Sequence, residues 1–331
     1  MHIPGNGLKF VGTGAAVAEQ TLTNADLSQI VETSDEWIQS RTGMQERRLC
    51  LPDQSLAALG VQAGQQALQQ AGLTPNAIDC IILATSTPDD LFGSAAQIQA
   101  RLKATQAFAF DITAACSGFV VGLNTAAQFI RTGTYQRILL IAGDVLSRWV
   151  DWQDRTTCVL FGDGAGAVIL EAQAGQDNLL AFEMFTNGSL NHCLTLGFQG
   201  QTRQLTLDKS VSQGTYQPIA MNGREVYRFA VARVPEIIEK VLYKADLTPE
   251  AVDWLIMHQA NQRILDAVGD RLGIPSEKIV SNIRRYGNTS AATIPLALQE
   301  MVAADKIQRG NLLVFAGFGA GVSWAASVVR W

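Results

Sequence analysis

The sequence predicts an α/β fold in which helices cover both faces of largely parallel sheets, and in which this arrangement occurs twice. Short apolar runs such as 137–143 alternate with segments of helical periodicity such as 56–72. The chain also repeats itself. AGLTPNAID at 71–79 and ADLTPEAVD at 245–253 are identical at six of nine positions, and RILLIAG at 137–143 matches NLLVFAG at 311–317 at the same offset of 174. A common offset between separate segments predicts a duplication.

Each half is expected to run helix, buried strand, helix, buried strand. The predicted elements of the first half are a helix over 56–72, a strand from Cys80, a helix within 115–130, a strand over 137–143 and a closing strand that ends near Glu171. Those of the second half are a helix over 226–245, a strand from Trp254, a helix that opens near Asn288 and a strand over 311–317. Residues 173–220 are polar and aperiodic, so we expect a connection with one or two strands, 179–187 among them. The predicted halves are residues 1–172, which carry a candidate nucleophilic cysteine, and 173–331, which carry a candidate histidine and asparagine.

Composition excludes several classes of protein. The net charge is −5 and no basic tract exists, which argues against a nucleic-acid partner. The chain shows no secretion signal and no apolar run long enough to span a membrane. Its five cysteines are scattered and form no CxxC pair, which indicates reduced thiols and a cytoplasmic location. With only three histidines, we expect no metal site.

The stretch DITAACSGF places Cys116 among small residues at the expected start of a helix. A thiol has an unperturbed pKa of about 8.5, and a helix N-terminus lowers it. The small neighbours would leave room for a substrate, so the position suits a thiolate nucleophile. The competing interpretation is a buried, inert cysteine, which is the more common case.

His258 and Asn288 are the other candidates. His258 directly follows the apolar run of LIMHQAN, where a core histidine is also common; Asn288 follows a glycine in RYGNTSAA, where a turn or cap residue is also common. The duplication pairs the region of Cys116 with that of Asn288, and ligands gather at the carboxyl ends of strands in such folds. The glycines of GFGAG, 317–321, would either make a tight turn or supply backbone donors for an oxyanion. FGDGAG at 161–166 precedes a strand, so it does not predict a dinucleotide site.

Six stretches together resemble the β-ketoacyl-acyl carrier protein synthase III family, across nearly the whole chain and in the family's order. They are TSDEWIQSRTGMQERR, DITAACSGF, DRTTCVLFGDGAGAVIL, HQANQRI, YGNTSAATIPLAL and GFGAGVSW. The resemblance implies a thiolase-like fold with a duplicated αβαβα layered architecture, mixed five-stranded sheets and a homodimer. It also implies a condensing enzyme that initiates fatty acid synthesis from an acyl-coenzyme A, with acetyl-coenzyme A expected, and malonyl-acyl carrier protein. Coenzyme A thioester is then a substrate, and no cofactor is permanently bound.

The resemblance also implies a role for individual residues. Cys116 would be the nucleophile, His258 and Asn288 would assist decarboxylation, and the backbone N–H groups of Cys116 and Ala320 would form the oxyanion hole. The remaining implied residues are Thr33, Trp37, Arg41, Arg155 and Asn261 for coenzyme A, Phe92 and Phe318 for the acyl pocket, with Phe92 crossing the dimer interface, and Arg228 and Arg263 for the acyl carrier protein. Two departures from the family weaken parts of this pattern, namely Asp270 within the expected basic dock and Arg224 near the coenzyme A site.

Two alternatives remain open. A specialised relative would use a longer or aromatic primer, or release its product to coenzyme A. A non-catalytic acyl-binding subunit would have lost the nucleophile, whereas this chain keeps Cys116. A thiolase proper is disfavoured because its second catalytic cysteine is missing from GFGAG.

Overall fold

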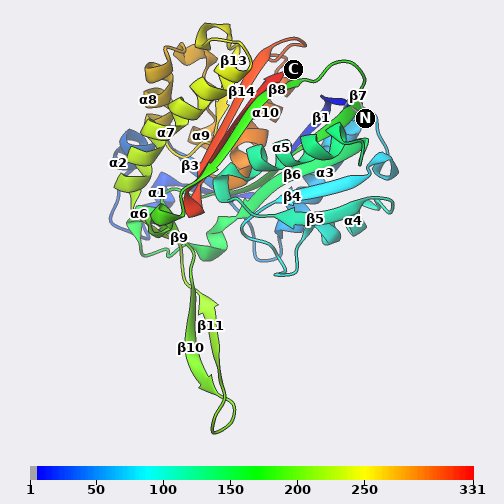
Figure 1. Cartoon of the computed structure of the whole chain (residues 1–331). Helices are drawn as coiled ribbons and strands as arrows, with labels where there is room; N and C mark the ends of the chain where they lie inside the picture. Colours follow the sequence, from blue (N-terminus) through cyan, green and yellow to red (C-terminus); the bar gives the residue numbers. More distant parts are fainter. Residues whose placement is uncertain (1–5) are drawn as a thin grey trace.

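The computed structural model describes residues 6–331; residues 1–5, with His2 and the start of the first predicted half, lie outside it. Two sheets form its framework (Figure 1). The first sheet has the strand order β1 (Gly7–Val17), β7 (Asp163–Gln173), β6 (Arg137–Val145), β4 (Cys80–Ala84) and β5 (Phe108–Ile112). The second has the order β8 (Leu179–Thr186), β15 (Ser323–Arg330), β14 (Leu312–Gly319) and β13 (Trp254–Met257).

Both sheets are mixed rather than largely parallel. In the first, β4 pairs in parallel with β5 and β6, whereas β7 pairs antiparallel with both β6 and β1. The second repeats this scheme, because β13 and β14 are parallel and β15 is antiparallel to β14 and β8. The strand that would match β5 is reduced to a single parallel bridge between Leu255 and Ile279. The second sheet therefore has four strands where five were expected.

Helices form three layers around the two sheets. The helices are α1 (Asn24–Leu27), α2 (Asp35–Thr42), α3 (Leu56–Ala71), α4 (Ala95–Leu102), α5 (Gly118–Arg131), α6 (Arg155–Cys158), α7 (Gly223–Lys244), α8 (Gln262–Leu272), α9 (Ile283–Tyr286) and α10 (Thr293–Ala303). α5 and α10 share a core with side chains from both sheets, so they form the central layer. α3 and α4 cover the outer face of the first sheet, and α7 and α8 that of the second.

Strand β6 shows why the central strands read as continuous apolar runs. Ile138 and Leu140 point into the core of the central layer, whereas Leu139 and Ile141 point towards α3. A strand that is covered on both faces has no polar side, so its sequence does not alternate. The apolar run of 137–143 is therefore dictated by the layered architecture.

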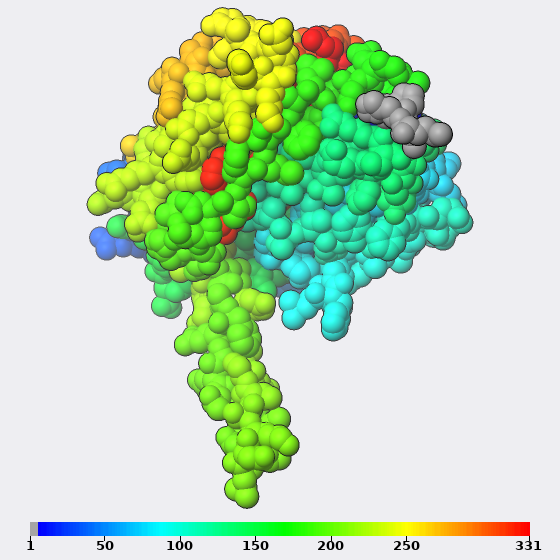
Figure 2. Space-filling model, viewed as in Figure 1, coloured from blue at the N-terminus to red at the C-terminus, as the bar shows by residue number. Residues whose placement is uncertain are grey.

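The connection between the halves contains more strands than predicted. Strand β8 coincides with the expected 179–187, but four further strands follow, namely β9 (Leu194–Thr195), β10 (Phe198–Gln204), β11 (Ser210–Tyr216) and β12 (Ala220–Met221). β10 and β11 form a hairpin that projects away from the body of the protein (Figures 1 and 2). Every residue of the two strands is exposed, so no buried face imposes the alternating pattern that predicts a strand. A small sheet of β2 (Gln20–Thr23) and β3 (Glu46–Leu49) completes the strands.

Within residues 6–331, none of the helices has both the length and the apolar character that crossing a membrane would require.

Candidate functional site

Cys116 lies in a short 3₁₀ turn, η2 (Ala115–Ser117), that leads directly into α5. Ser117 closes the turn, since its backbone N–H and its hydroxyl both donate to the carbonyl of Ala114, at 3.1 and 2.6 Å. Ala115 has a φ of 46°, a left-handed conformation that is rare for a residue with a side chain. The strained turn holds the sulfur at the amino end of α5, where it is only 7% exposed.

The end of β14 fixes this turn from the other side. A methyl group on Gly319 would lie 2.5 Å from the backbone nitrogen of Cys116, and one on Gly317 would lie 3.0 Å from the Cα of Ser117. Both positions therefore require glycine on steric grounds. The glycines of 317–321 bring the backbone of β14 against the candidate nucleophile, which is the close approach that an oxyanion hole would need.

His258 lies just beyond β13 and is 2% exposed. Its backbone N–H donates to the carbonyl of Ala316 at 2.8 Å, and its ring packs edge-on against Phe318 with centroids 5.3 Å apart. The Nδ1 atom lies 2.8 Å from the hydroxyl of Thr293, and this hydroxyl lies 2.9 Å from the carbonyl of Ser290. Both contacts are satisfied when Thr293 donates to Ser290 and Nδ1–H donates to Thr293. Nε2 then carries a lone pair.

Burial lowers the pKa of His258 to about 3, so the imidazole is neutral at neutral pH. In this tautomer it is a hydrogen-bond acceptor at Nε2. To assist decarboxylation by donating to an oxygen, His258 would need an N–H at Nε2, which this resting tautomer does not supply.

Asn288 is 7% exposed and is held by both its backbone and its side chain. Its backbone N–H donates to Leu160 at 2.9 Å, and its carbonyl accepts from Gly162 at 3.0 Å. The side-chain Oδ1 accepts from the backbone N–H of Ser290 at 2.8 Å. This contact orients the amide and leaves its NH₂ group as a donor.

The structure brings the three candidates together at one cavity of about 500 Å³. Cys116, His258 and Asn288 all line it, although they lie on segments far apart in the sequence. Phe318 lines the same cavity and is 5% exposed, so an apolar ring stands beside the polar groups. A thiol, a neutral imidazole and an amide around one apolar cavity can transfer an acyl group and stabilise a developing oxyanion.

The protonation state of Cys116 differs from the expectation. Burial raises the pKa of the thiol to about 12, which outweighs the opposing hydrogen bond from the hydroxyl of Ser290 to Sγ at 3.3 Å. The position of the sulfur at the start of α5 does not lower the thiol pKa enough to compensate for the loss of solvent. The sulfur therefore rests as a thiol, and a nearby group must take its proton when it attacks.

Asp144 is a buried residue of the site that sequence reasoning missed. It is fully buried at the end of β6, and it accepts hydrogen bonds from Thr85, Ser86 and Thr87 at 2.8–3.0 Å and from the backbone N–H of Ala291 at 3.3 Å. Burial raises its pKa, and the hydrogen bonds partly offset this effect. Asp144 thus ties the first sheet to the turn that begins at Ser290. The Asp within an apolar run was the available signal.

Arg47 was also missed. Its side chain is completely buried and donates to Asn24 Oδ1 at 2.8 Å, to the carbonyl of Val159 at 2.7 Å and to that of Leu22 at 3.3 Å. Burial lowers its pKa to about 10. Arg47 therefore supports the segment around Val159 and Leu160, to which Asn288 is hydrogen-bonded. Nothing in the sequence distinguishes Arg47 from its neighbour Arg48.

The residues expected to bind coenzyme A gather at the same cavity, with one exception. Trp37, Arg41, Arg155 and Asn261 line it, whereas Thr33 does not. The guanidinium of Arg155 lies 4.9 Å above the ring of Trp37, so the two side chains stack on each other. An adenine can lie between them only if Arg155 moves.

Asn261 already uses both ends of its side chain. Oδ1 accepts from the backbone N–H of Arg263 at 2.9 Å, which caps α8, and Nδ2 donates to the carbonyl of Arg41 at 2.9 Å. It therefore positions two basic residues at the cavity. Arg263 and Arg224 also line the cavity, whereas Arg228, on α7, is exposed and does not.

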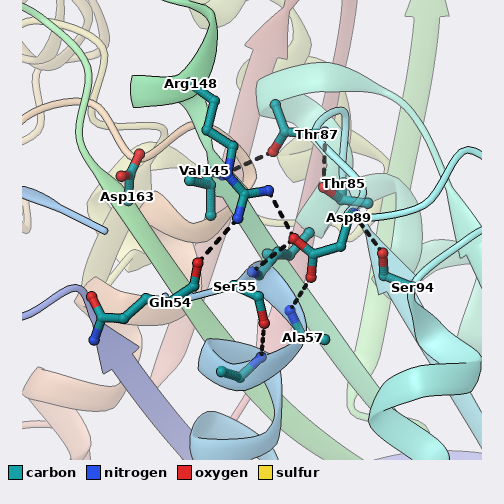
Figure 3. Close-up of polar contacts among 12 residues, drawn as sticks. Gln54, Ser55, Ala57, Thr85, Thr87, Asp89, Ser94, Val145, Arg148 and Asp163 are labelled. Carbon is teal, nitrogen blue, oxygen red and sulfur yellow. Dashed lines mark hydrogen bonds and ion pairs between the residues drawn. The ribbon is translucent and has the colours of Figure 1, made fainter. Parts of the chain in front are cut away.

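Within one chain, Phe92 and Phe318 line different cavities, and the expected role of Phe92 at the pocket of a partner copy is not tested by a single chain. Phe92 is fully exposed and lines a second, wider cavity of about 1,220 Å³, which Cys116 and Ala320 also line. Hydrogen bonds to Asp89 anchor the base of the loop that carries Phe92. Figure 3 shows Asp89 accepting from Ala57 at the start of α3 and from Arg148, both at 2.8 Å.

Comparisons with known proteins agree on one family. Two family models match, described as 3-oxoacyl-[acyl-carrier-protein] synthase III over residues 110–188 and as the C-terminal part of the same protein over 242–331. The β-ketoacyl-[acyl-carrier-protein] synthase III of Synechocystis sp. is 70% identical over 100% of both chains. That of Synechococcus elongatus is 61% identical over 100% of this chain and 99% of the relative.

Solved structures of the same kind are similar in fold. The crystal structure of 3-oxoacyl-[acyl-carrier-protein] synthase III from Aquifex aeolicus VF5 superimposes with a TM-score of 0.90 at 43% identity, covering 98% of this chain and 100% of that one. The corresponding enzyme of Thermus thermophilus gives a TM-score of 0.89 at 38% identity, covering 97% and 98%.

Proposed function

Because the chain belongs to the 3-oxoacyl-[acyl-carrier-protein] synthase III family, whose members are acyl-transferring condensing enzymes that initiate fatty acid synthesis, we propose that Cys116 carries the acyl group of this reaction. The primer is an acyl-coenzyme A, with acetyl-coenzyme A expected, and the extender is malonyl-acyl carrier protein. The observation that carries the proposal is the meeting of Cys116, His258 and Asn288 at one cavity.

In the first step, Cys116 takes the acyl group from coenzyme A. The thiol rests protonated, so Nε2 of His258, which carries a lone pair, accepts the proton as the sulfur attacks the thioester carbonyl. The new C–S bond forms at Sγ, the bond to the coenzyme A sulfur breaks, and His258 returns the proton to that sulfur. Backbone N–H groups of Cys116 and Ala320 stabilise the tetrahedral oxyanion, where the loss of one donor typically costs about 3–4 kcal/mol.

In the second step, the malonyl thioester loses CO₂ and becomes an enolate. The amide NH₂ of Asn288, oriented by Ser290, donates to the enolate oxygen. For His258 to donate as well, its proton has to move from Nδ1 to Nε2, and the hydroxyl of Thr293 then has to turn and donate to Nδ1. The enolate carbon attacks the acyl carbon, the bond to Sγ breaks, and the cysteine recovers a proton from solvent.

Purified protein tests this proposal directly. Incubation with acetyl-coenzyme A and malonyl-acyl carrier protein should yield acetoacetyl-acyl carrier protein and CO₂, and mass spectrometry after acetyl-coenzyme A alone should find the acetyl mass on Cys116. Ranking primers of increasing length by turnover separates an acetyl-specific enzyme from a relative that uses longer or aromatic primers. If the folded protein takes up no acyl group, only the role of a non-catalytic acyl-binding subunit remains.

The carrier protein is acidic, and basic residues surround the mouth of the cavity. Arg224 and Arg263 line it, and Arg228 is exposed on the same helix as Arg224. We propose that these three side chains receive the carrier, with Asp270 weakening one part of the dock. Reversing the charge of Arg228 should raise the KM for the malonyl carrier and leave the acylation by coenzyme A thioester unchanged.

Two exposed features support a homodimer. Strand β5 is an edge strand, and its Phe108 is 60% exposed. Leu91 and Phe92 are 81% and 102% exposed beside the wider cavity. An apolar edge strand and a loop of exposed apolar residues favour a second copy of the chain as the partner. In the proposed dimer, Phe92 of each copy closes the wider cavity of the other, and sedimentation should give twice the mass of one chain.

We also propose that the chain consists of the halves 1–172 and 173–331, and that it works in the cytoplasm. The matching strand orders of the two sheets support the first statement, and five free cysteines fit a reducing compartment.

A further inference from the structure

Three metal-ligating side chains to which the proposed reaction gives no role meet at the wall of the Cys116 cavity. His192 and Cys193 end the 3₁₀ turn η4 (Gly188–Cys193), and Glu225 lies in the first turn of α7. The Sγ of Cys193 lies 2.9 Å from Oε2 of Glu225 and 3.7 Å from Nε2 of His192, and Nε2 lies 3.2 Å from the same carboxylate. Within residues 6–331 this is the one group of such side chains whose ligand atoms are close enough to share an ion.

The backbone fixes two of the three ligands relative to each other. Strands β9 and β12 pair antiparallel directly after Cys193 and directly before α7. The backbone N–H of Asn222 donates to the carbonyl of Cys193 at 2.8 Å, and the side chain of Asn222 caps α7 by accepting from Glu225 at 3.3 Å. Cys193 is 3% exposed, whereas His192 is exposed, so the buried thiol has an open side that a solvated ion can reach.

The ligand set and its dimensions suit zinc. Zinc binds thiolate at about 2.3 Å and imidazole at about 2.0–2.1 Å, which separates tetrahedral ligand atoms by about 3.3–3.6 Å. The observed separations of 2.9, 3.2 and 3.7 Å need only small adjustments. A thiolate and a carboxylate together neutralise a divalent ion, and thiolate with imidazole favours zinc over magnesium or calcium.

We propose that His192 Nε2, Cys193 Sγ and the carboxylate of Glu225 bind one zinc ion, with solvent as the fourth ligand. On binding, the Cys193 S–H bond breaks, sulfur keeps the electron pair and the proton leaves to the buffer. Arg224 and Arg228 lie close to Glu225 in the sequence, and their positive charges repel the ion. The negative charges of the thiolate and the carboxylate compensate for this repulsion. The ion joins η4 to α7, and therefore fastens the segment that carries the β10–β11 hairpin to the body of the protein.

The proposed site departs from the expectation, drawn from the small number of histidines, that the chain has no metal site. Neighbouring positions in the sequence supply His192 and Cys193, and the fold brings Glu225 to them. Cys193 and Glu225 line the same cavity as Cys116, so the ion would lie at its wall, although none of the three ligands has a role in the proposed acyl transfer.

Titration of chelator-treated protein tests the site. Zinc, measured in competition with a chromophoric chelator, should bind at one equivalent, and cobalt should give tetrahedral visible bands with a thiolate charge-transfer band. Cys193→Ala should remove that equivalent, and Glu225→Gln, at a more exposed position that should tolerate the change, should weaken binding at least tenfold. Zinc should also raise the melting temperature of the unmodified chain and not that of Cys193→Ala.

Cys116→Ala is the matched control, because Cys116 shares a cavity with His258 and could itself attract zinc. It should keep the zinc equivalent and the cobalt spectrum. If the equivalent survives in folded Cys193→Ala, is lost in Cys116→Ala, or fails to bind at micromolar zinc, the proposal is wrong.

Discussion

The contact between Gly319 and the nucleophile turn makes a quantitative prediction. A methyl group at this position would lie 2.5 Å from the nitrogen of Cys116 and 2.9 Å from the Cβ of Ala115, whereas ordinary contacts begin at 3.4 Å. Gly319→Ala therefore has to displace the turn or β14 by roughly 1 Å. Gly319 has a φ of −163°, so the backbone itself accepts alanine and the cost is purely steric. Overpacking of this kind costs about 1–3 kcal/mol, and a misplacement of about 1 Å slows catalysis by about 10²-fold.

Two measurements separate the local effect from general destabilisation. The rate of coenzyme A release in a single acylation turnover should fall about 10²-fold, while the melting temperature falls by only a few degrees. Gly188→Ala is the matched control, because a methyl group there meets nothing within 4 Å and its φ is not in the left-handed region. If folded Gly319→Ala acylates at the rate of the unmodified enzyme, the close packing of β14 on Cys116 does not position the nucleophile.

Four further predictions follow from the same geometry. Cys116→Ser should abolish acyl transfer but keep some malonyl decarboxylation, measured as CO₂ release, because His258 and Asn288 remain; loss of both activities in folded protein would contradict the division of roles. The pKa of His258 lies near 3 in the folded state and near 6.5 in the unfolded state. The free energy of unfolding should therefore be at its full value above pH 6.5 and fall by about 3 kcal/mol between pH 6.5 and 4.5. Urea titration should find this loss reduced in His258→Gln. Asp144→Asn replaces an acceptor by a donor among buried N–H and O–H groups and should cost about 1–3 kcal/mol in urea unfolding, whereas an unchanged midpoint would show that the carboxylate is dispensable. Phe108→Asp should yield monomers in sedimentation, and a persistent dimer would place the interface elsewhere.

The layered fold could be predicted because the hydrophobic periodicity and the internal repeat of the sequence reflect which residues are buried. Strand β6 is apolar on both faces and helix α3 carries a stripe of buried residues. Each element can therefore be recognised from its own stretch of sequence. The offset of 174 then predicts that the two halves repeat one strand order, which the two sheets display apart from the bridge at Ile279. The hairpin β10–β11 could not be predicted in this way, because exposure on both faces removes the pattern.

The three central members of the candidate site could be predicted, but its buried supports and its protonation states could not. Both the family resemblance and the internal repeat of the sequence indicate Cys116, His258 and Asn288. Whether the thiol ionises depends on how completely α5 and β14 exclude water, and that is a property of tertiary packing. The tautomer of His258 likewise depends on Thr293, whose hydroxyl acquires its role only when the turn after Asn288 folds back on the ring. The cluster at Cys193 was missed for the same reason, because Glu225 is distant in the sequence.

In the proposed reaction, the protonation states explain how the three side chains work as a set even though none is activated alone. A thiol whose pKa is near 12 is a weak nucleophile, and an imidazole whose pKa is near 3 is a weak base in the resting enzyme. Burial causes both shifts because it disfavours each charged form. A thiolate and an imidazolium side by side, however, form an ion pair, so transfer of one proton between them creates two charges that stabilise each other where water is excluded. The same exclusion of water strengthens the donors that face the oxyanion and the enolate. The low polarity that keeps the resting site neutral therefore favours the charged transition states, provided that the donors are already in place, and the strained turn at Ala115 together with the glycines of β14 holds them there.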